Sequence, residues 1–290
     1  MIMKRVILGL VVCLCGSFVA NAQKDNENAN KYLDFNYDKK AVKERKVVPY
    51  PPLREADVIY AKRVERVIDT REKKNMVMQW PKNPLNRVIY NLVTNGADAK
   101  GFGKLKAYRT DSLDKAMTIE DIKKLGGFCE TVAVQNPNNP DDPYDTFDST
   151  VCTDFDYTSV KRYKIKEEWI FDKQRGMFFP RIVSIAPLYK PNLAGVELPE
   201  QEMFFVSFEE LRPILVNEEV FNRQNDAMRM TYYDFFEQRM FSSFITFESN
   251  DKDMQINAFP EFKDNPMEAL YESERIREDL FNWEHDLWEY

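Results

Sequence analysis

Two adjacent carboxylates, Glu167 and Glu168, are the residues of this sequence that most readily suggest hydrolytic chemistry. A pair of carboxylates hydrolyses a glycosidic bond when both side chains face one substrate. These two lie in a stretch that is typical of a β-strand, where successive side chains point to opposite faces. We therefore expect Glu167 and Glu168 to be separated, solvated carboxylates and not a catalytic pair.

A second acidic group, Asp141, Asp142, Asp145 and Asp148, falls in one loop that is rich in proline and asparagine. Loops with several carboxylates can bind Ca²⁺. This one lacks the ligand spacing, the central glycine and the closing glutamate of a Ca²⁺-binding loop. We predict no metal site.

Nucleophilic catalysis has few possible participants. The chain has one histidine, His285, placed among acidic residues, and only nine glycines from which to build a phosphate-binding loop. No serine or cysteine has a partner base that the spacing identifies. The sequence therefore predicts no catalytic residue and no cofactor, while a carboxylate-dependent hydrolase or a ligand-binding module stays an alternative.

Residues 1–22 have the features of a secretory signal peptide. Lys4-Arg5 precedes a short apolar run, and Ala20-Asn21-Ala22 offers small residues at a cleavage site. The apolar run is shorter than a membrane-spanning helix requires. Its removal leaves 268 residues with 39 Lys+Arg and 48 Asp+Glu, a net charge of −9. We expect an exported protein with no nucleic-acid partner and no direct membrane insertion.

Two cysteines, Cys129 and Cys152, remain after cleavage. Exported proteins commonly oxidise such pairs, so a disulfide between them is expected, with two buried free thiols as the alternative. The two are too far apart in sequence for a Cys-x-x-Cys redox motif.

The rest of the chain divides into an arm, a domain and a terminal helix. Residues 23–52 are charged and proline-rich, which predicts an extended arm. Residues 53–264 are expected to form a single α+β domain, a small mostly antiparallel sheet packed by several helices. Its strands are predicted at 104–110, 203–208 and 241–247 and in a long hairpin over 163–185 that turns at 173–176. Its helices are predicted at 53–75, 83–96, 118–126 and 225–240.

Residues 265–290 predict an acidic amphipathic helix. Its small and apolar residues recur in steps of four and three, as in a helix–helix seam: Ala269, Ser273, Ile276, Leu280, Trp283 and Leu287. Residues 266–290 carry a net charge of −6, whereas residues 43–74 carry +4. Opposite charges at the two ends fit head-to-tail contacts between copies, but an intramolecular contact or two solvated faces is the simpler explanation of the charges alone.

Several ordered blocks of charged and aromatic residues resemble the GldN/PorN family of the Bacteroidota type IX secretion system. The blocks are 51–58 (PPLREADV), 66–75 (RVIDxREKxN), 165–175 (IKEEWxFDKQR), 181–188 (RIxxIAPL), 217–227 (NEEVFNRxNDA), 239–243 (RMFSS) and 248–250 (ESN).

This resemblance implies a non-enzymatic periplasmic component of a ring beneath the outer membrane. Its implied partners are an outer-membrane lipoprotein of the GldK/PorK type, the periplasmic part of a GldM/PorM-type motor protein and further copies of the chain. The lipoprotein would supply the attachment to the membrane, in support of protein export and gliding motility.

We expect the ring contacts to involve the segment 53–75 and the hairpin at 167–175, because a protein core does not tolerate such charge density. The candidate interaction residues are Arg54, Arg66, Arg71, Glu167, Glu168, Trp169, Lys173 and Arg175. For Trp169, packing within the hairpin is the simpler alternative.

Overall fold

The computed structural model describes residues 42, 45–96, 101, 103–126, 129–135, 146–152, 155–193, 196–225 and 227–286. The chain forms two compact units, residues 1–44 and 45–290, and nearly all described residues belong to the second. The predicted signal peptide and most of the predicted arm lie outside the described residues. Within the described part of the chain, no helix has the length and apolar character needed to cross a membrane.

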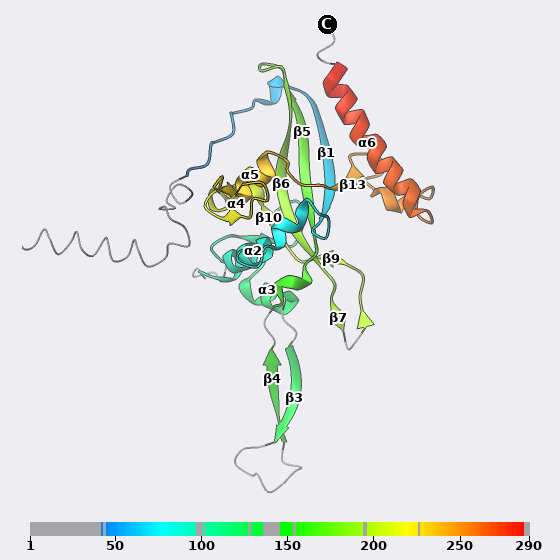
Figure 1. Cartoon of the computed structure of the whole chain (residues 1–290). Coiled ribbons are helices and arrows are strands. Elements are labelled where there is room, and N and C mark those ends of the chain that lie inside the picture. The colour runs from blue at the N-terminus through cyan, green and yellow to red at the C-terminus, as the bar shows by residue number, and fades with distance from the viewer. Residues whose placement is uncertain are drawn as a thin grey trace, which may run out of the picture. The chain divides into compact units, whose positions relative to one another are not determined.

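A seven-stranded antiparallel sheet forms the centre of the second unit (Figure 1). Its strand order is β13 (Phe244–Glu248), β1 (Val58–Asp69), β5 (Arg162–Asp172), β6 (Met177–Tyr189), β10 (Phe205–Ser207) and β2 (Ala107–Tyr108), and β9 (Gln201–Glu202) also pairs with β6. The predicted hairpin is β5–β6, and its turn contains Gly176 at a φ of 60°. The α+β fold with a mostly antiparallel sheet is thus confirmed.

The helix predicted over 53–75 was wrong, because β1 occupies the middle of that segment. Tyr60, Val64 and Ile68 have helical spacing, yet they also lie an even number of residues apart and so share one face of a strand. The positions between them on that face are taken by Lys62 and Arg66. These charged residues interrupt the alternation of apolar and polar residues by which a strand is recognised. The β-branched residues of this segment favour the extended conformation.

Five helices are described: α2 (Leu85–Thr94), α3 (Ile119–Gly126), α4 (Phe208–Leu215), α5 (Tyr232–Glu237) and α6 (Pro266–Asp286). As predicted, α2 follows Pro84 and stops before Gly96, which has a φ of 80°. The predicted helix over 225–240 is reduced to α5. Thr231 and Asp234 form a reciprocal capping box at its start, so the aromatic stripe begins at Tyr232.

Short ladders and turns connect these elements. Two-stranded sheets form from β3 (Cys129–Gln135) with β4 (Thr146–Cys152), β7 (Asn192–Leu193) with β8 (Val196–Glu197), and β11 (Glu219–Val220) with β12 (Met230–Thr231). Single 3₁₀ turns cover η2 (Glu55–Asp57), η3 (Asn75–Gln79), η4 (Tyr157–Ser159) and η5 (Ile256–Ala258). The acidic, proline-rich loop between β3 and β4 lies outside the described residues.

Two hydrophobic clusters hold the unit together. The larger one, called the helical core here, packs α2, α3, α4 and α5 against β5, β6 and β10, with Ile89, Ile165, Phe208 and Phe235 among its buried residues. The smaller one, called the terminal-helix cluster, packs α6 against β1, β6 and β13 through Val64, Phe178, Ile245, Ile276 and Leu280. In Figure 1 the short helices lie beside β6 and β10, and α6 lies beside β13.

Candidate interaction surface

A buried ion cluster lies where β1 and β5 pair. The Glu167 carboxylate is fully buried and accepts hydrogen bonds from Arg66 Nε at 3.1 Å and Arg239 Nη2 at 3.0 Å. Trp169 Nε1 donates to the same carboxylate at 3.2 Å, and both guanidinium groups lie within 6 Å of the Trp169 ring. Burial lowers the pKa of Arg66, and the charge of Glu167 opposes that effect. One fully buried carboxylate therefore serves two arginines, of which Arg66 is buried and Arg239 is partly exposed.

The backbone of Arg239 supports this cluster. Arg239 follows the last turn of α5 with a φ of 51°, and the amides of Arg239 and Met240 donate to the carbonyls of Phe236 and Phe235. This is a Schellman-type helix end, where glycine is usual. A side chain at such a position costs about 1 kcal/mol. The contact of Arg239 with Glu167 offsets that cost and connects α5 to β5.

The ion cluster changes the interpretation of two candidate residues. Arg66 and Glu167 are buried, so the expectation that such charges must lie at the surface was wrong for them. Glu168 is exposed on the opposite side of β5, as predicted, but the expectation of solvation holds for Glu168 only. Long strand side chains can satisfy one another inside the fold when they are matched in charge and geometry.

The other candidates lie at or near the surface. Arg54, Arg71, Lys173 and Arg175 are exposed, and Trp169 is half-buried. Two of the arginines also hold carboxylates in place: Arg71 contacts Asp69 at 2.5 Å, and Arg175 contacts Asp172 at 2.5 Å.

The pKa of Asp69 lies well below its ordinary range. The side-chain hydrogen bond from Arg71 is the main cause, burial opposes it, and Arg162 adds to the lowering. Burial likewise opposes the lowering of the Asp172 pKa, for which the hydrogen bond from Arg175 is responsible. Interaction with a partner through Arg71 or Arg175 would therefore compete with contacts inside the chain.

The end of the predicted arm, residues 45–52, is fixed to the second unit. Arg45 makes a two-pronged contact with Asp234, with N–O distances of 2.6 and 2.7 Å. Tyr50 donates to Glu237 at 2.6 Å. The Arg212 and Arg181 guanidinium groups lie 3.5 and 4.9 Å from the centre of the Tyr50 ring. Burial, followed by the hydrogen bond to Glu237, raises the pKa of Tyr50. Residues 45–52 of the predicted arm therefore belong to the folded surface of the second unit.

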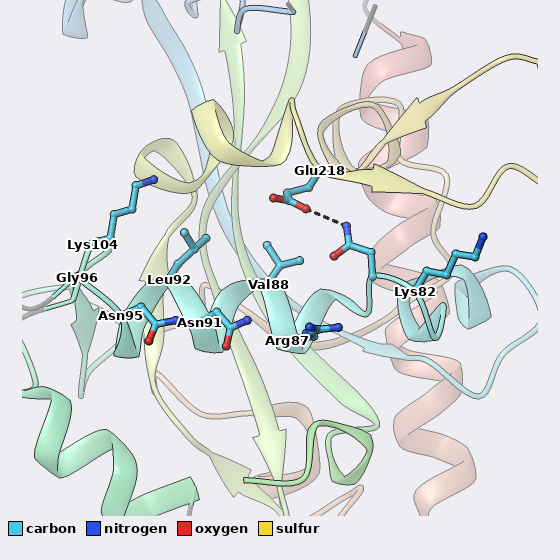
Figure 2. Close-up of a pocket in the computed structure, with 10 residues that line it drawn as sticks. Lys82, Arg87, Val88, Asn91, Leu92, Asn95, Gly96, Lys104 and Glu218 are labelled. Carbon is cyan, nitrogen blue, oxygen red and sulfur yellow. Dashed lines mark hydrogen bonds between the residues drawn. The ribbon is translucent and has the colours of Figure 1, made fainter. Parts of the chain in front are cut away.

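A groove of about 570 Å³ lies beside α2, on the side that faces Glu218 (Figure 2). Val88 and Leu92 supply its apolar part, and polar side chains surround them: Lys82, Asn83, Arg87, Asn91, Asn95, Lys104 and Glu218. Figure 2 shows Lys104 and Lys82 near the two ends of the helix. Glu218 accepts a hydrogen bond from Asn83 at 2.9 Å. Three cations and one carboxylate give the groove an excess of positive charge.

Gly103 explains how Lys104 reaches this groove. A Cβ atom on Gly103 would lie 1.9 Å from the carbonyl oxygen of Val93, so only glycine permits the chain to approach the end of α2. The amide of Lys104 then donates to the carbonyl of Asn95. The Gly101–Lys104 stretch is therefore a packing feature.

The terminal helix uses its predicted seam inside the protein. Ala269, Ser273, Ile276 and Leu280 are buried, and the Trp283 ring stacks on Tyr60 with centroids 4.1 Å apart. The seam predicted for a helix–helix contact therefore packs on the molecule's own sheet. The acidic helix thus meets β1, the strand within the basic segment, through apolar side chains of the same chain.

The opposite face of α6 is exposed. Its large apolar residues, with exposed fractions between 50% and 66%, are Met267, Leu270, Tyr271 and Phe281. They occupy one side of the helix together with Glu274 and Glu278. An exposed row of large apolar side chains is typical of a protein contact.

The described carboxylates give little support for hydrolysis. Among the carboxyl groups of the described residues, each pKa that departs from its ordinary range is lowered, in Asp69, Asp111, Asp114, Asp121, Asp172 and Asp234. A general acid needs a raised pKa. No group of three or more His, Cys, Asp or Glu residues in the described ranges is placed to hold a metal ion.

The backbone register of the β3–β4 ladder places Cys129 directly opposite Cys152. Opposed residues of antiparallel strands have Cα atoms about 4.5–5.5 Å apart, within the range that a disulfide spans.

The family model for the gliding motility associated protein GldN matches residues 53–289. The chain belongs to the GldN family. The match extends from the segment before β1 to beyond α6, so it includes the sheet, both hydrophobic clusters and the terminal helix. No curated protein matches the chain. The description of the family associates its members with gliding motility.

Proposed function

We propose that this GldN-family protein is a non-enzymatic structural component of the periplasmic ring of the type IX secretion system. It would assemble with an outer-membrane lipoprotein of the GldK/PorK type and contact the periplasmic part of a GldM/PorM-type motor protein. In this role it supports protein export and gliding motility. The observation that carries the proposal is the family match over residues 53–289.

Three features of the chain support a structural role. The residues 1–22 fit a secretory signal peptide, which suits a periplasmic protein whose membrane attachment a lipoprotein partner would supply. The perturbed carboxylates have pKa values lowered by hydrogen bonds within the chain, as in Asp69 with Arg71, which is a structural use of these groups. The outer face of α6 and the groove on α2 present surfaces of opposite charge.

The proposal is tested by the size and partners of the protein in intact cells. A tagged copy expressed in its host should fractionate with the envelope after crosslinking, in a particle far larger than one 34.3 kDa chain. The tag should copurify an outer-membrane lipoprotein, whereas an unrelated tagged periplasmic protein should not. Recovery as a free monomer with no envelope partner would contradict the proposal.

Within this function, Cys129 and Cys152 are proposed to form a disulfide that closes the base of the β3–β4 hairpin. Protein isolated from the periplasm should resist alkylation at both cysteines until it is reduced, with a mass difference of about 2 Da between the two forms. Alkylation of both cysteines without reduction would show free thiols instead.

A further inference from the structure

A pocket of about 330 Å³ lies beside the part of β6 that follows the hairpin turn. Among the described residues, β10 pairs with β6 only at Ser184 and beyond, so this part of the strand has β5 on one side and no strand on the other. The arm at Tyr50 and Pro51 and the end of α5 at Glu237 and Arg239 form the remaining walls. The pocket therefore fills a place at the side of the sheet that loops border.

Arg181 lines this pocket and is held there by neutral groups. Its Nη2 donates to the carbonyl of Pro51 at 3.0 Å, and its guanidinium carbon lies 4.9 and 5.0 Å from the centres of the Tyr50 and Phe179 rings. Its Nε is buried and has no hydrogen-bond partner in the described part of the chain. A guanidinium group is a planar fork of N–H donors that matches a carboxylate. Arg181 is thus fixed in position while its charge stays available for an anion.

The pocket as a whole has an excess of positive charge, since three arginines and one carboxylate line it. Arg175 and Arg239 form ion pairs within the chain, yet their side chains are 38% and 29% exposed. The carboxylate, Glu237, contacts Arg212 at 3.2 Å. The pocket therefore favours an anion, and Arg181 is the lining arginine that pairs with no described carboxylate.

Apolar side chains precede Arg181 on the same side of β6. Phe179 and Met177 lie two and four residues before it, so the three side chains follow one another at intervals of about 6.6 Å. Met177 is 53% exposed and Phe179 is half-buried, so both offer surface to a ligand. An extended peptide has the same interval between its alternate side chains. A carboxylate and an apolar side chain two residues apart in such a peptide match Arg181 and Phe179.

We propose that this pocket binds an extended acidic segment of a partner protein, in which an Asp or Glu lies two residues from a large apolar residue. The carboxylate pairs with Arg181, and the apolar side chain packs on Phe179 and Met177. This inference goes beyond the proposed function, because it rests on the pocket and not on the family match.

Synthetic peptides test the recognition directly. The probe is Ala-Asp-Ala-Leu-Ala with an amidated C-terminus and an uncharged fluorescent dye on its N-terminus, and the matched control has Asn in place of Asp. Fluorescence anisotropy with the full chain measures both affinities. The Asp peptide should bind at least about tenfold more tightly, because hydrogen bonds between two ionised groups are about twice as strong as neutral ones. Equal affinities would overturn the proposal.

Substitutions in the pocket test which residues recognise the peptide. Arg181→Gln should abolish the preference for Asp over Asn, whereas Arg87→Gln, at an exposed arginine of α2, should leave it unchanged. Met177→Asp changes an exposed residue and should weaken binding of the Asp peptide about fivefold, because it adds a like charge to the pocket. Unchanged melting temperatures establish that the variants fold. A preference that persists in Arg181→Gln, or binding that Met177→Asp does not weaken, would exclude this site.

Methyl NMR of the full chain with isotope-labelled methionine locates the bound peptide. The Met177 methyl signal should shift as the Asp peptide is added, while the signal of Met267, exposed on α6, should not. Shifts at Met267 without a shift at Met177 would place the peptide elsewhere and refute the pocket. Failure of these binding tests leaves the proposed function standing, whereas recovery of the chain from cells as a free monomer removes the proposed function and leaves the pocket.

Discussion

The helical core and the terminal-helix cluster stabilise the same sheet in different ways. The helical core encloses many fully buried aliphatic and aromatic residues between four helices and three strands. The terminal-helix cluster has few fully buried residues and depends on half-buried rings, among them Tyr60, Trp169, Phe171 and Trp283. Because burial of apolar area sets most of the stability, the helical core determines whether the chain folds. The terminal-helix cluster determines whether α6 stays in place and which of its faces is offered to partners.

The ion cluster lies between these two regions. Ile165, Glu167 and Trp169 alternate along β5 and so share one face of the sheet. Ile165 belongs to the helical core, and Trp169 packs on the terminal-helix cluster. Arg239 joins Glu167 from the end of α5, so the cluster ties a helix of the larger region to a strand shared by both.

Phe235→Ala should have the largest effect. Phe235 is 1% exposed in the helical core, so its removal leaves a cavity and should lower the free energy of unfolding by about 3–5 kcal/mol. Urea denaturation followed by circular dichroism measures the change. Phe281→Ala, at an exposed ring, should change stability by less than about 0.5 kcal/mol. Similar losses for both variants would contradict the assignment of the core.

Glu167→Gln should have the next largest effect. It should lower the free energy of unfolding by about 3 kcal/mol, because it leaves two guanidinium groups without their buried countercharge. Glu168→Gln is the matched control, since the neighbouring carboxylate is exposed and its replacement should be nearly neutral. Denaturation at two salt concentrations checks both. If the two variants behaved alike, the ion cluster would have no structural role.

Leu280→Ala should act on one region only. Leu280 is 3% exposed on the inner face of α6. Its truncation should lower the free energy of local unfolding of α6 by about 2–3 kcal/mol. Hydrogen exchange should then speed up for the amides of α6 while those of α2 and α4 keep their protection, because the helical core does not depend on this contact. Equal acceleration in both regions would show that the two clusters unfold as one unit.

The smallest effect on stability is expected from removing or protonating the Asp69 carboxylate. The lowered pKa of Asp69 in the folded protein means that its stabilising contribution is complete above the unfolded pKa of about 4 and disappears as the pH falls further. Asp69→Asn should therefore cost about 1 kcal/mol at pH 7, a value kept small by solvent screening. The difference in free energy of unfolding between the wild-type protein and Asp69→Asn should disappear as the pH is lowered from about 5 to 2. A gap that stayed constant over that range would assign the stabilisation to another group.

The regular elements with local signals were predictable from the sequence. Pro84 and Gly96 delimit α2, Thr118 caps α3, and the residues 173–176 turn the hairpin. The strand β1 was missed, because Lys62 and Arg66 take inward positions that an alternation rule expects to be apolar. The Thr231–Asp234 capping box was a local signal that would have placed the start of α5.

The site was less predictable than the fold. Partners for Glu167 come from positions 66 and 239, and no spacing rule joins residues so far apart in sequence. The groove on α2 likewise combines Lys104 and Glu218 with the helix. The buried face of α6 carries the residues whose spacing predicted it. The sequence could not show that this face packs on the sheet of the same chain.

One hydrogen bond at the edge of the sheet has a consequence for solubility. The Ser273 hydroxyl on α6 accepts from the amide of Ile245 in β13, at 2.8 Å, which occupies a donor that an incoming strand would use. The sheet ends on its other side at β2, a strand of two residues. Unpaired edges template aggregation when many molecules are crowded together. One backbone donor of β13 is thus occupied by the chain's own helix and β2 offers an edge of only two residues, so little of the described sheet is free to pair with a strand of another molecule.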